Sequence, residues 1–256
     1  MEHKTTVHII GAGVSGLIAA YELEQAGYHP VVFEKQGNCG GRIQTVTVTD
    51  YELDLGFQVL LSAYPLAKKY LDLEALSLRK LQSGAQILVD GKRFLIGDPL
   101  RDWKVLLPTL FSEIGSLTDK LRVLKLSLLL RKKSLDDIFS TPEVSTLDYL
   151  KTFGFSNKII TRFFQPFFAG IFLETGLQTS SRMFEFVYKM FGEGHAMIPQ
   201  RGIGAISEQL KAKLVQTTFK FNCEVQSLTD TTITLTSGED ISHQGVIVTS
   251  NAATLI

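Results

Sequence analysis

Three glycines near the start of the chain have the spacing of a loop that holds phosphate groups. Gly11, Gly13 and Gly16 form a G-x-G-x-x-G pattern between an apolar run, residues 7–10, and a helix-forming run, residues 17–26. In such a loop the first glycine permits a tight turn, the second lets a pyrophosphate approach the backbone, and the third lets helix and strand pack closely. The helix adds free N–H groups and the positive end of its dipole. This pattern predicts a site for the pyrophosphate of a dinucleotide.

An acidic residue follows at the position that such a site needs. Residues 29–33 form a second apolar run that is typical of a strand, and Glu34 comes directly after it. A carboxylate at the end of this strand can accept hydrogen bonds from both hydroxyls of the adenosine ribose. The order of strand, glycines, helix, strand and acid predicts a Rossmann-type domain. It disfavours the alternative, a tight turn that binds no ligand.

A second glycine pair distinguishes between two classes of dinucleotide. Residues 35–45 read KQGNCGGRIQT and include Gly40, Gly41 and Arg42. A nicotinamide cofactor has no standard need for a second glycine loop, whereas the phosphates and ribityl chain of an extended FAD pass one. The pair therefore favours a flavin, and an NAD-binding protein with additional glycines is the disfavoured alternative.

This segment resembles the flavin amine oxidase superfamily, which includes monoamine and polyamine oxidases, protoporphyrinogen oxidase and the phytoene desaturases. The residues that match its G-G-R-x-x-[ST] motif are Gly40, Gly41, Arg42 and Thr45. Asn38 stands where the family often has arginine. Residues 54–58, DLGFQ, are similar to the family's D-x-G segment, which brings backbone close to the flavin ring. Residues 199–204, PQRGIG, are a variant of its P-x-G-G segment, with Arg201 where glycine is usual.

The resemblance implies FAD as the cofactor. The residues expected to bind it are Gly11, Ala12, Gly13, Val14, Ser15, Gly16, Glu34, Lys35, Gly40, Gly41, Arg42, Gly56, Phe57, Gln58 and Val225. No catalytic residue is assigned, because the flavin performs the electron chemistry and the protein mainly orients the substrate. His195 lies beside the P-x-G-G variant, and a hydrogen-bonded structural role is favoured for it over an acid–base role. Histidine and cysteine have no metal-ligand spacing, so no metal is expected.

Composition indicates a core-rich globular protein without a strong charge field. The 256 residues include 26 Lys and Arg against 26 Asp and Glu, which gives no global attraction for nucleic acid. Two cysteines, Cys39 and Cys223, fit a reducing compartment. The N-terminus has no signal-peptide core, and no run approaches the ~18 apolar residues of a spanning helix. We therefore expect a cytoplasmic protein with no nucleic-acid partner.

The pattern of elements changes along the chain. Residues 1–60 read as β-α-β plus the glycine-pair loop, and residues 85–96 read as a hairpin that turns at Asp90-Gly91. Residues 101–192 are largely helical in pattern. The apolar residues that illustrate this spacing are Leu117, Leu121, Leu124 and Leu128.

A helix is then expected over residues 203–216, and strand patterns return after residue 219. Residues 245–249 are apolar enough to rejoin a buried parallel sheet. The predicted fold class is α/β, a Rossmann-type FAD-binding domain formed by residues 1–60 and 199–256. A largely helical substrate domain, residues 61–198, is inserted in it. Family members continue beyond such a returning strand, so we expect a C-terminally truncated fragment in preference to a chain that a partner completes.

Two features bear on the substrate and on partners. Nine aromatic side chains occur within residues 163–191; core packing is the favoured explanation, and a pocket for a flat or polyene-like apolar substrate is the alternative. Residues 119–133 carry six Lys and Arg against one Asp, a local charge of +5. Basic residues that border an ordinary buried leucine face are the favoured interpretation. Peripheral contact with an anionic membrane surface is the second interpretation.

We therefore predict an FAD-dependent oxidoreductase that oxidises a C–N or C–C bond of an apolar small molecule by hydride transfer to the flavin. A protoporphyrinogen oxidase-like enzyme is the alternative within the same class. A non-catalytic subunit that holds FAD or mediates an interaction is the alternative from a different class. The sequence makes no prediction of the oligomeric state.

Overall fold

The chain forms two compact units in the computed structural model, which describes residues 6–56, 59–82, 84–97, 109 and 112–251. Unit 1 comprises residues 1–60, 65–79 and 197–256, and unit 2 comprises residues 61–64 and 80–196. The predicted boundaries, 1–60, 61–198 and 199–256, differ from these units at residues 65–79 and 197–198, which belong to unit 1. The strands in which the chain passes from one unit to the other are β5 (Leu60–Leu61), β6 (Leu78–Lys80) and β9 (Ala196–Pro199).

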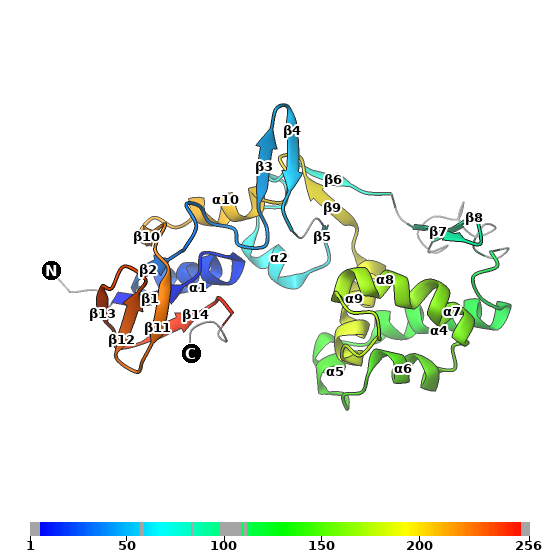
Figure 1. Ribbon diagram of the computed structural model, residues 1–256. Helices are drawn as coiled ribbons and strands as arrows, with labels where there is room; N and C mark the ends of the chain where they lie inside the picture. Colours follow the sequence, from blue (N-terminus) through cyan, green and yellow to red (C-terminus); the bar gives the residue numbers. More distant parts are fainter. Residues whose placement is uncertain (1–5, 57–58, 83, 98–108, 110–111, 252–256) are drawn as a thin grey trace. The chain divides into compact units, whose positions relative to one another are not determined.

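The centre of unit 1 is a parallel sheet (Figure 1). Its order is β10-β2-β1-β14, and every neighbouring pair is parallel. The helix α1 (Val14–Gln25) connects β1 to β2, as the β-α-β pattern predicted. The returning strand predicted over residues 245–249 is present as β14 and pairs with β1. The bounds of the four strands are β1 (Thr6–Ile10), β2 (His29–Phe33), β10 (Thr218–Lys220) and β14 (Val246–Val248).

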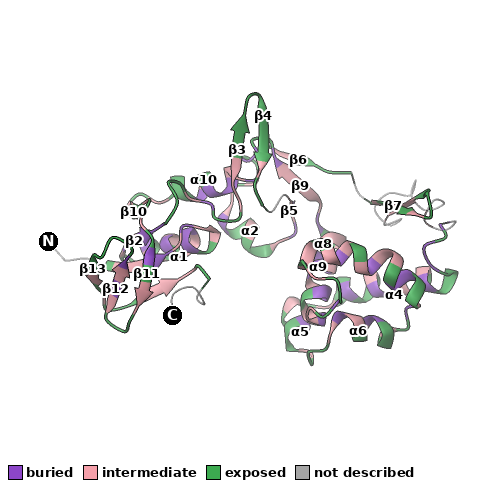
Figure 2. Ribbon diagram, in the orientation of Figure 1, coloured by how far each residue is buried: buried purple, intermediate pink, exposed green. Residues whose placement is uncertain are grey.

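Alternating residues of this sheet fill two different cores. Ile9 and Val32 are fully buried in a cluster that also contains Ala20 of α1. Their neighbours Ile10 and Phe33 point to the opposite face and pack with a small antiparallel sheet. Its strands pair in the order β11 (Val225–Leu228), β12 (Thr232–Leu235) and β13 (Asp240–Ser242). Figure 2 shows the buried residues gathered where these layers meet. The helix α1 therefore packs on one face of the parallel sheet, and the small antiparallel sheet packs on the other.

The described part of unit 1 also contains a hairpin and two further helices. The hairpin pairs β3 (Thr45–Val48) with β4 (Tyr51–Asp54). The helices are α2 (Pro65–Tyr70) and α10 (Ala205–Ala212), so the helix predicted over residues 203–216 is shorter than expected. Tyr70 explains why α2 belongs to this unit: its hydroxyl donates to Glu22 of α1 at 2.6 Å, and its carbonyl accepts from Lys213 at 2.6 Å.

Unit 2 begins with the hairpin of β7 (Ala85–Val89) and β8 (Lys92–Ile96), as predicted. Its turn residues Asp90 and Gly91 have φ angles of 51° and 75°, which match the left-handed conformation that an Asp-Gly pair adopts readily. The rest of the described part of unit 2 is largely helical. Its helices are α4 (Leu117–Lys132), α5 (Leu135–Ser140), α6 (Thr146–Phe153), α7 (Asn157–Ile159), the π-helical turn η2 (Ile160–Phe164), α8 (Gln165–Phe172) and α9 (Ser181–Glu193).

Serines start most of these helices. The side chains of Ser116, Ser134, Ser145, Ser156 and Ser180 each accept a hydrogen bond from a backbone N–H in the first turn of α4, α5, α6, α7 and α9. Such a cap satisfies an N–H group that has no partner within the helix. Sequence-local chemistry therefore sets where the helices begin.

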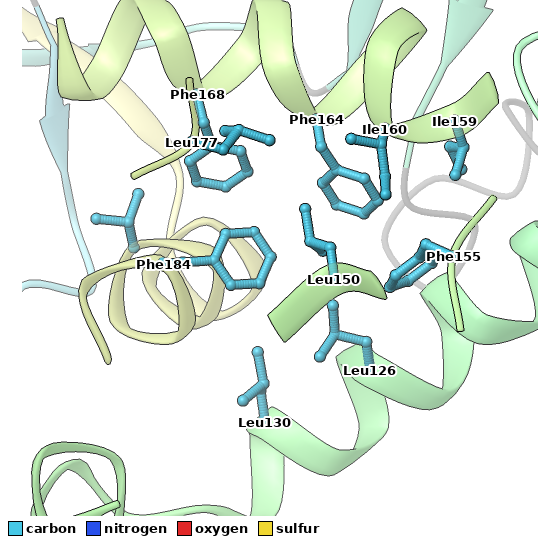
Figure 3. Close-up of a cluster of buried hydrophobic side chains, with 11 residues drawn as sticks. Leu126, Leu130, Leu150, Phe155, Ile159, Ile160, Phe164, Phe168, Leu177 and Phe184 are labelled. Atoms are coloured by element: carbon cyan, nitrogen blue, oxygen red, sulfur yellow. The ribbon is translucent and has the colours of Figure 1, made fainter. Parts of the chain in front are cut away.

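Leucine and phenylalanine side chains form the core of unit 2 (Figure 3). Phe164, Phe168 and Phe184 are buried there, so core packing accounts for part of the aromatic cluster. Leu126 and Leu130 supply the buried face of α4. The four leucines that indicated this helix do not share that face, because Leu117, Leu121, Leu124 and Leu128 are exposed. The helix prediction is confirmed, and a buried leucine face is present, but these four leucines are not part of it.

Among the described residues, no helix has both the length and the apolar composition needed to cross a bilayer.

Candidate cofactor site

The predicted phosphate loop forms the turn between β1 and α1. Gly11 has a φ of 101°, a conformation that favours glycine. A Cβ at Gly16 would overlap the carbonyl oxygen of Gly11, so the closest helix–strand contact requires glycine. Gly13 differs from both, because a Cβ there would meet nothing within 4 Å. The space in front of Gly13 is therefore open, as a loop that binds a ligand through its backbone requires.

The N-terminus of α1 can accept an anion. Gly13 occupies the N-cap position without a side-chain hydrogen bond, and the first turn contains no acidic residue. First-turn N–H groups have no partner within a helix, and the dipole makes this end positive. The amides of Val14 and Ser15, both predicted to bind the cofactor, belong to this turn. Free backbone N–H groups therefore lie next to the open space at Gly13, an arrangement that can bind a pyrophosphate.

Thr249 supports the same turn, although sequence reasoning did not single it out. Its hydroxyl lies 2.9 Å from the carbonyl oxygen of Ile10 and 3.0 Å from that of Gly11. Its amide also donates to Ile10 at 2.9 Å. A polar residue directly after the returning strand was the available signal. The last strand of the sheet thereby fixes the first glycine of the loop.

Glu34 lies buried at the end of β2 and is held by two backbone amides. One carboxylate oxygen accepts from the Ala12 amide at 2.8 Å, and the other accepts from the Gln36 amide at 2.9 Å. Each oxygen keeps a further lone pair, which a ribose hydroxyl can use. Ala12 is fully buried and its amide serves Glu34, so its evident role is to position the acid. Lys35, the next predicted residue, is exposed.

The second glycine pair lies directly against the first loop. The Gly40 amide donates to the Ala12 carbonyl at 2.9 Å, and Gly13 forms a parallel bridge with Gly40. A Cβ at Gly41 would lie 3.3 Å from the Cα of Gly13. Gly40 and Gly41 have φ angles of 127° and 59°. The two glycine segments, about thirty positions apart in sequence, thus form one backbone-lined surface.

The D-x-G segment joins this surface through Gly56. A Cβ at Gly56 would overlap the carbonyl oxygen of Arg42, so the close approach of these two backbones requires glycine. The side chain of Arg42 is exposed. Phe57 and Gln58, which were also predicted to bind the cofactor, lie outside the described residues.

Two polar side chains connect three of the sequence motifs. Thr45 of the G-G-R-x-x-T motif donates from its hydroxyl to Asp54 at 2.6 Å. The same Asp54 oxygen accepts from the Ile203 amide at 2.9 Å, and Thr45 accepts from the Gly204 amide at 2.8 Å. Asp54 and Thr45 thereby hold the variant P-x-G-G segment in place. Their evident role is to position the segment.

Ser207 on α10 was not predicted and ties the same segments together. It is 2% exposed, and its hydroxyl lies 2.9 Å from the carbonyl oxygen of Ile43 and 3.0 Å from that of Gly204. A serine within a helical pattern carried no sequence signal for this role. The remaining predicted residue, Val225, has a buried side chain in the core with Ile10 and Phe33. Any contact of Val225 with a cofactor would therefore use its backbone.

Other candidate residues have structural partners. Arg201 forms an exposed ion pair with Glu208 at 3.3 Å. The His195 amide donates to the Ser62 hydroxyl at 2.9 Å. Burial raises the pKa of the Cys39 thiol, which keeps it protonated and unreactive at neutral pH. The described residues contain no group of histidine, cysteine and carboxylate side chains suited to a metal ion.

The family follows from a comparison that covers most of the chain. A family model described as flavin containing amine oxidoreductase matches residues 14–256. The chain belongs to this family. The predicted superfamily is thus confirmed, and the prediction of FAD is confirmed at the level of the family.

Curated relatives of this flavin family match parts of the chain. Protoporphyrinogen oxidase 2 of Arabidopsis thaliana is 30% identical over 169 residues, which cover 64% of this chain and 32% of that protein. A probable flavin-containing monoamine oxidase A of Dictyostelium discoideum is 34% identical over 89 residues, which cover 34% of this chain and 20% of that protein. The matched region thus spans about a third or less of these relatives' lengths.

Solved structures show the same fold. An oxidoreductase from Methanosarcina mazei superposes with a TM-score of 0.70 at 21% identity, covering 95% of this chain and 58% of that one. A putative protoporphyrinogen oxidase from Exiguobacterium sp. 255-15 gives a TM-score of 0.66 at 19% identity, covering 98% and 60%. At this identity the likeness concerns the fold alone.

The site geometry fits FAD. Open space at Gly13, the uncapped start of α1 and the adjoining pair Gly40 and Gly41 form a backbone surface suited to the phosphates. The buried carboxylate of Glu34 lies at the end of the neighbouring strand, where it can hold the adenosine ribose. These residues would hold the adenosine and pyrophosphate portions.

Proposed function

We propose that this chain is the FAD-binding part of an oxidoreductase that oxidises a C–N or C–C bond of an apolar small molecule. When bound, FAD supplies the acceptor for the hydride. The observation that carries the proposal is the meeting of the two glycine segments, Gly13 against Gly40 and Gly41, beside the buried Glu34.

The chain's own residues would mainly bind and position. The amides of Val14 and Ser15 would face the pyrophosphate, and Glu34 would hold the ribose hydroxyls. Asp54 and Thr45 would fix the backbone of residues 202–204 through their hydrogen bonds. Catalytic residues are not assigned, since the protein's part in flavin chemistry is largely orientation and exclusion of competing reactions.

Unit 2 would serve as the substrate domain inserted into the flavin domain. Its helical content and aromatic side chains support this proposal. The similarity to a plant protoporphyrinogen oxidase supports a flat, apolar substrate of that general kind as the second candidate. A non-catalytic FAD-holding subunit is the proposal from a different class.

For location we propose the cytoplasm, with α4 as the segment that would contact a membrane surface. Leu128 and Leu129 on this helix are exposed, close in sequence to the basic residues Arg131 and Lys132. Co-sedimentation with anionic vesicles tests the contact. Loss of binding in an Arg131→Gln, Lys132→Gln double variant is expected, and undiminished binding of that variant would contradict it.

Gly13→Val tests the cofactor site with little risk to the fold. The φ of Gly13 is −72°, which any residue can adopt, and its Cβ would enter open space. We expect the variant to fold like the native chain but to lose flavin, because the side chain would occupy the position of the pyrophosphate. The visible flavin spectrum and a thermal melt measure both properties. Gly245→Val is the control, since a Cβ at Gly245 also meets nothing within 4 Å.

The reaction itself is tested by anaerobic bleaching of the flavin spectrum. Bleaching by an apolar amine or alkene donor supports an enzyme. A flavin that only a chemical reductant bleaches supports the non-catalytic subunit instead. Retention of stoichiometric flavin by Gly13→Val would contradict the proposed site.

A further inference from the structure

Unit 2 contains a cavity of about 590 Å³ whose described lining residues all belong to that unit. This volume lies within the roughly 300–1,000 Å³ that is typical of small-molecule sites. Residues of α4, η2, α8 and α9 line it, together with the beginning and end of the hairpin formed by β7 and β8. The cavity is therefore a property of unit 2 itself.

One wall of the cavity is an apolar stripe of α4 whose leucines are exposed. Leu117, Leu121 and Leu124 line the cavity and are 60%, 61% and 39% exposed. On the same helix, Leu126 and Leu130 are buried in the core. The helix thus has two apolar faces, of which one is buried and the other is exposed. Apolar surface in contact with water is unfavourable, so binding an apolar occupant in this cavity would be favourable.

A second wall is aromatic. Phe163 and Phe167 line the cavity and stack with ring centroids 5.7 Å apart. Phe191 also lines it and meets Phe167 edge-to-face at 5.5 Å. These rings are only partly buried, whereas Phe164 and Phe184 are fully buried in the core. The aromatic cluster therefore has a core part and a cavity part, and Phe168 belongs to both.

The described lining of the cavity has few polar side chains, and only one of them is charged. The hydroxyl oxygens of Ser127 and Tyr188 lie 3.2 Å apart at the cavity. The Ser127 hydroxyl has one proton and two lone pairs, so it can bond to Tyr188 and to a further polar atom. Among the described lining residues Lys120 carries the only charge, and its ammonium donates to the Ser112 carbonyl at 2.8 Å. Because no described lining residue is acidic, a cationic amine would find no counter-charge there.

We propose that this cavity binds a neutral, extended apolar molecule, with a polar atom of the ligand against the Ser127–Tyr188 hydroxyl pair. As the substrate site of an oxidoreductase this assignment rests on the proposed function. As a binding site it stands on unit 2 alone. Gly192 lines the cavity, and a Cβ there would meet nothing within 4 Å, so a side chain at this position would occupy ligand space.

The experiment uses the whole chain and the neutral fluorescent probe N-phenyl-1-naphthylamine. We expect saturable binding, which Gly192→Leu weakens at least tenfold because the leucine fills the cavity. Gly170→Leu is the matched control: Gly170 is also helical and unobstructed but does not line the cavity. Thermal melts verify that both variants are folded.

A second pair of variants keeps the test valid if Gly192→Leu fails to fold. Leu121→Gln changes an exposed lining residue, and Leu128→Gln changes an exposed leucine of the same helix outside the lining. We expect only Leu121→Gln to weaken the probe, by about threefold or more.

Three results would overturn the assignment: no saturable binding by the native chain, equal effects within each pair, or displacement of the probe by putrescine. Probe binding by a chain whose flavin no substrate reduces would instead refute the proposed function and leave the cavity assignment intact. Flavin reduction by a chain that does not bind the probe would refute the cavity assignment and leave the proposed function intact.

Discussion

The two units build their candidate sites from different materials. In unit 1 the candidate cofactor surface is backbone, and glycines at residues 11, 16, 40, 41 and 56 bring the segments close enough to form it. In unit 2 the cavity is made of side chains, mainly leucine and phenylalanine, on helices that serines cap. A backbone site depends on contacts that allow almost no additional atom. A side-chain site can change its volume and shape without loss of the fold. The comparison therefore predicts where the chain tolerates substitution.

The largest expected effect is that of Gly16→Ala in unit 1. Its Cβ would overlap a backbone oxygen, that of Gly11, which cannot move without displacing β1. We expect a loss of about 3 kcal/mol or more in the free energy of unfolding, together with loss of flavin. Chemical denaturation measures it, and Gly245→Ala is the control. A native-like stability of Gly16→Ala would show that the loop is less tightly packed than the structure indicates.

Asp119 should be the most sensitive polar residue of unit 2. This buried carboxylate accepts hydrogen bonds from the amides and hydroxyls of both Ser116 and Ser156, which join the starts of α4 and α7. Asp119→Ala would leave the part-buried N–H groups of Ser116 and Ser156 without this partner, so we expect a loss of about 2–3 kcal/mol. Denaturation followed by far-ultraviolet circular dichroism measures it. Asp136→Ala, an exposed acid in the first turn of α5, is the control.

Asp119 should also make the stability of unit 2 fall at acid pH. Burial by itself raises the pKa of Asp119, but the hydrogen bonds from Ser156 and Ser116 outweigh it and lower the pKa from 3.8 to about 2. The unfolded chain therefore binds the proton more readily. The stability that Asp119 contributes is complete above pH 3.8 and is lost as the pH falls toward about 2. Asp119→Asn should remove this part of the pH dependence, and an unchanged acid profile would contradict the assignment.

Glu34→Ala should have a smaller effect that concerns binding more than folding. The change removes the acceptor for the ribose hydroxyls, worth about 1–3 kcal/mol, so FAD should bind about one to two decades more weakly. Glu34→Gln should not restore binding, because its NH₂ group would face the amide of Ala12 or of Gln36. Flavin titration measures both variants. Full binding by Glu34→Gln would show that the two amides do not fix the carboxylate.

The smallest expected effect is a pH dependence in unit 1. Burial lowers the pKa of His8 below its ordinary 6.5, and the nearby His243 and Lys220 add to the shift. Stability is therefore present above pH 6.5 and declines as the pH falls through the folded-state pKa. Thermal melts across this range should show the decline, which His8→Gln abolishes and His243→Gln reduces. A slope that survives in His8→Gln would assign the titration to another group.

Local sequence patterns predicted the elements better than the packing between them. The β-α-β unit, the Asp90-Gly91 hairpin and the returning strand follow from short-range patterns and were confirmed. The placement of residues 65–79 was wrong because it depends on the bonds of Tyr70 to Glu22 and Lys213, which are distant in sequence. The exposure of Leu121 could not be predicted either, since α4 has apolar residues on more than one face.

The sequence by itself determined where the candidate site of unit 1 lies, because glycine is required wherever two backbones approach too closely for a Cβ. Such a requirement is visible in the sequence as a glycine at each of these positions, for example Gly11, Gly16 and Gly41. Tertiary structure alone decided which polar residues connect the motifs, as Ser207 and Thr249 show. It also decided which aromatic rings lie in the core of unit 2 and which line its cavity. The same residue type occurs in both places, so the position of each ring depends on which neighbouring helix covers it.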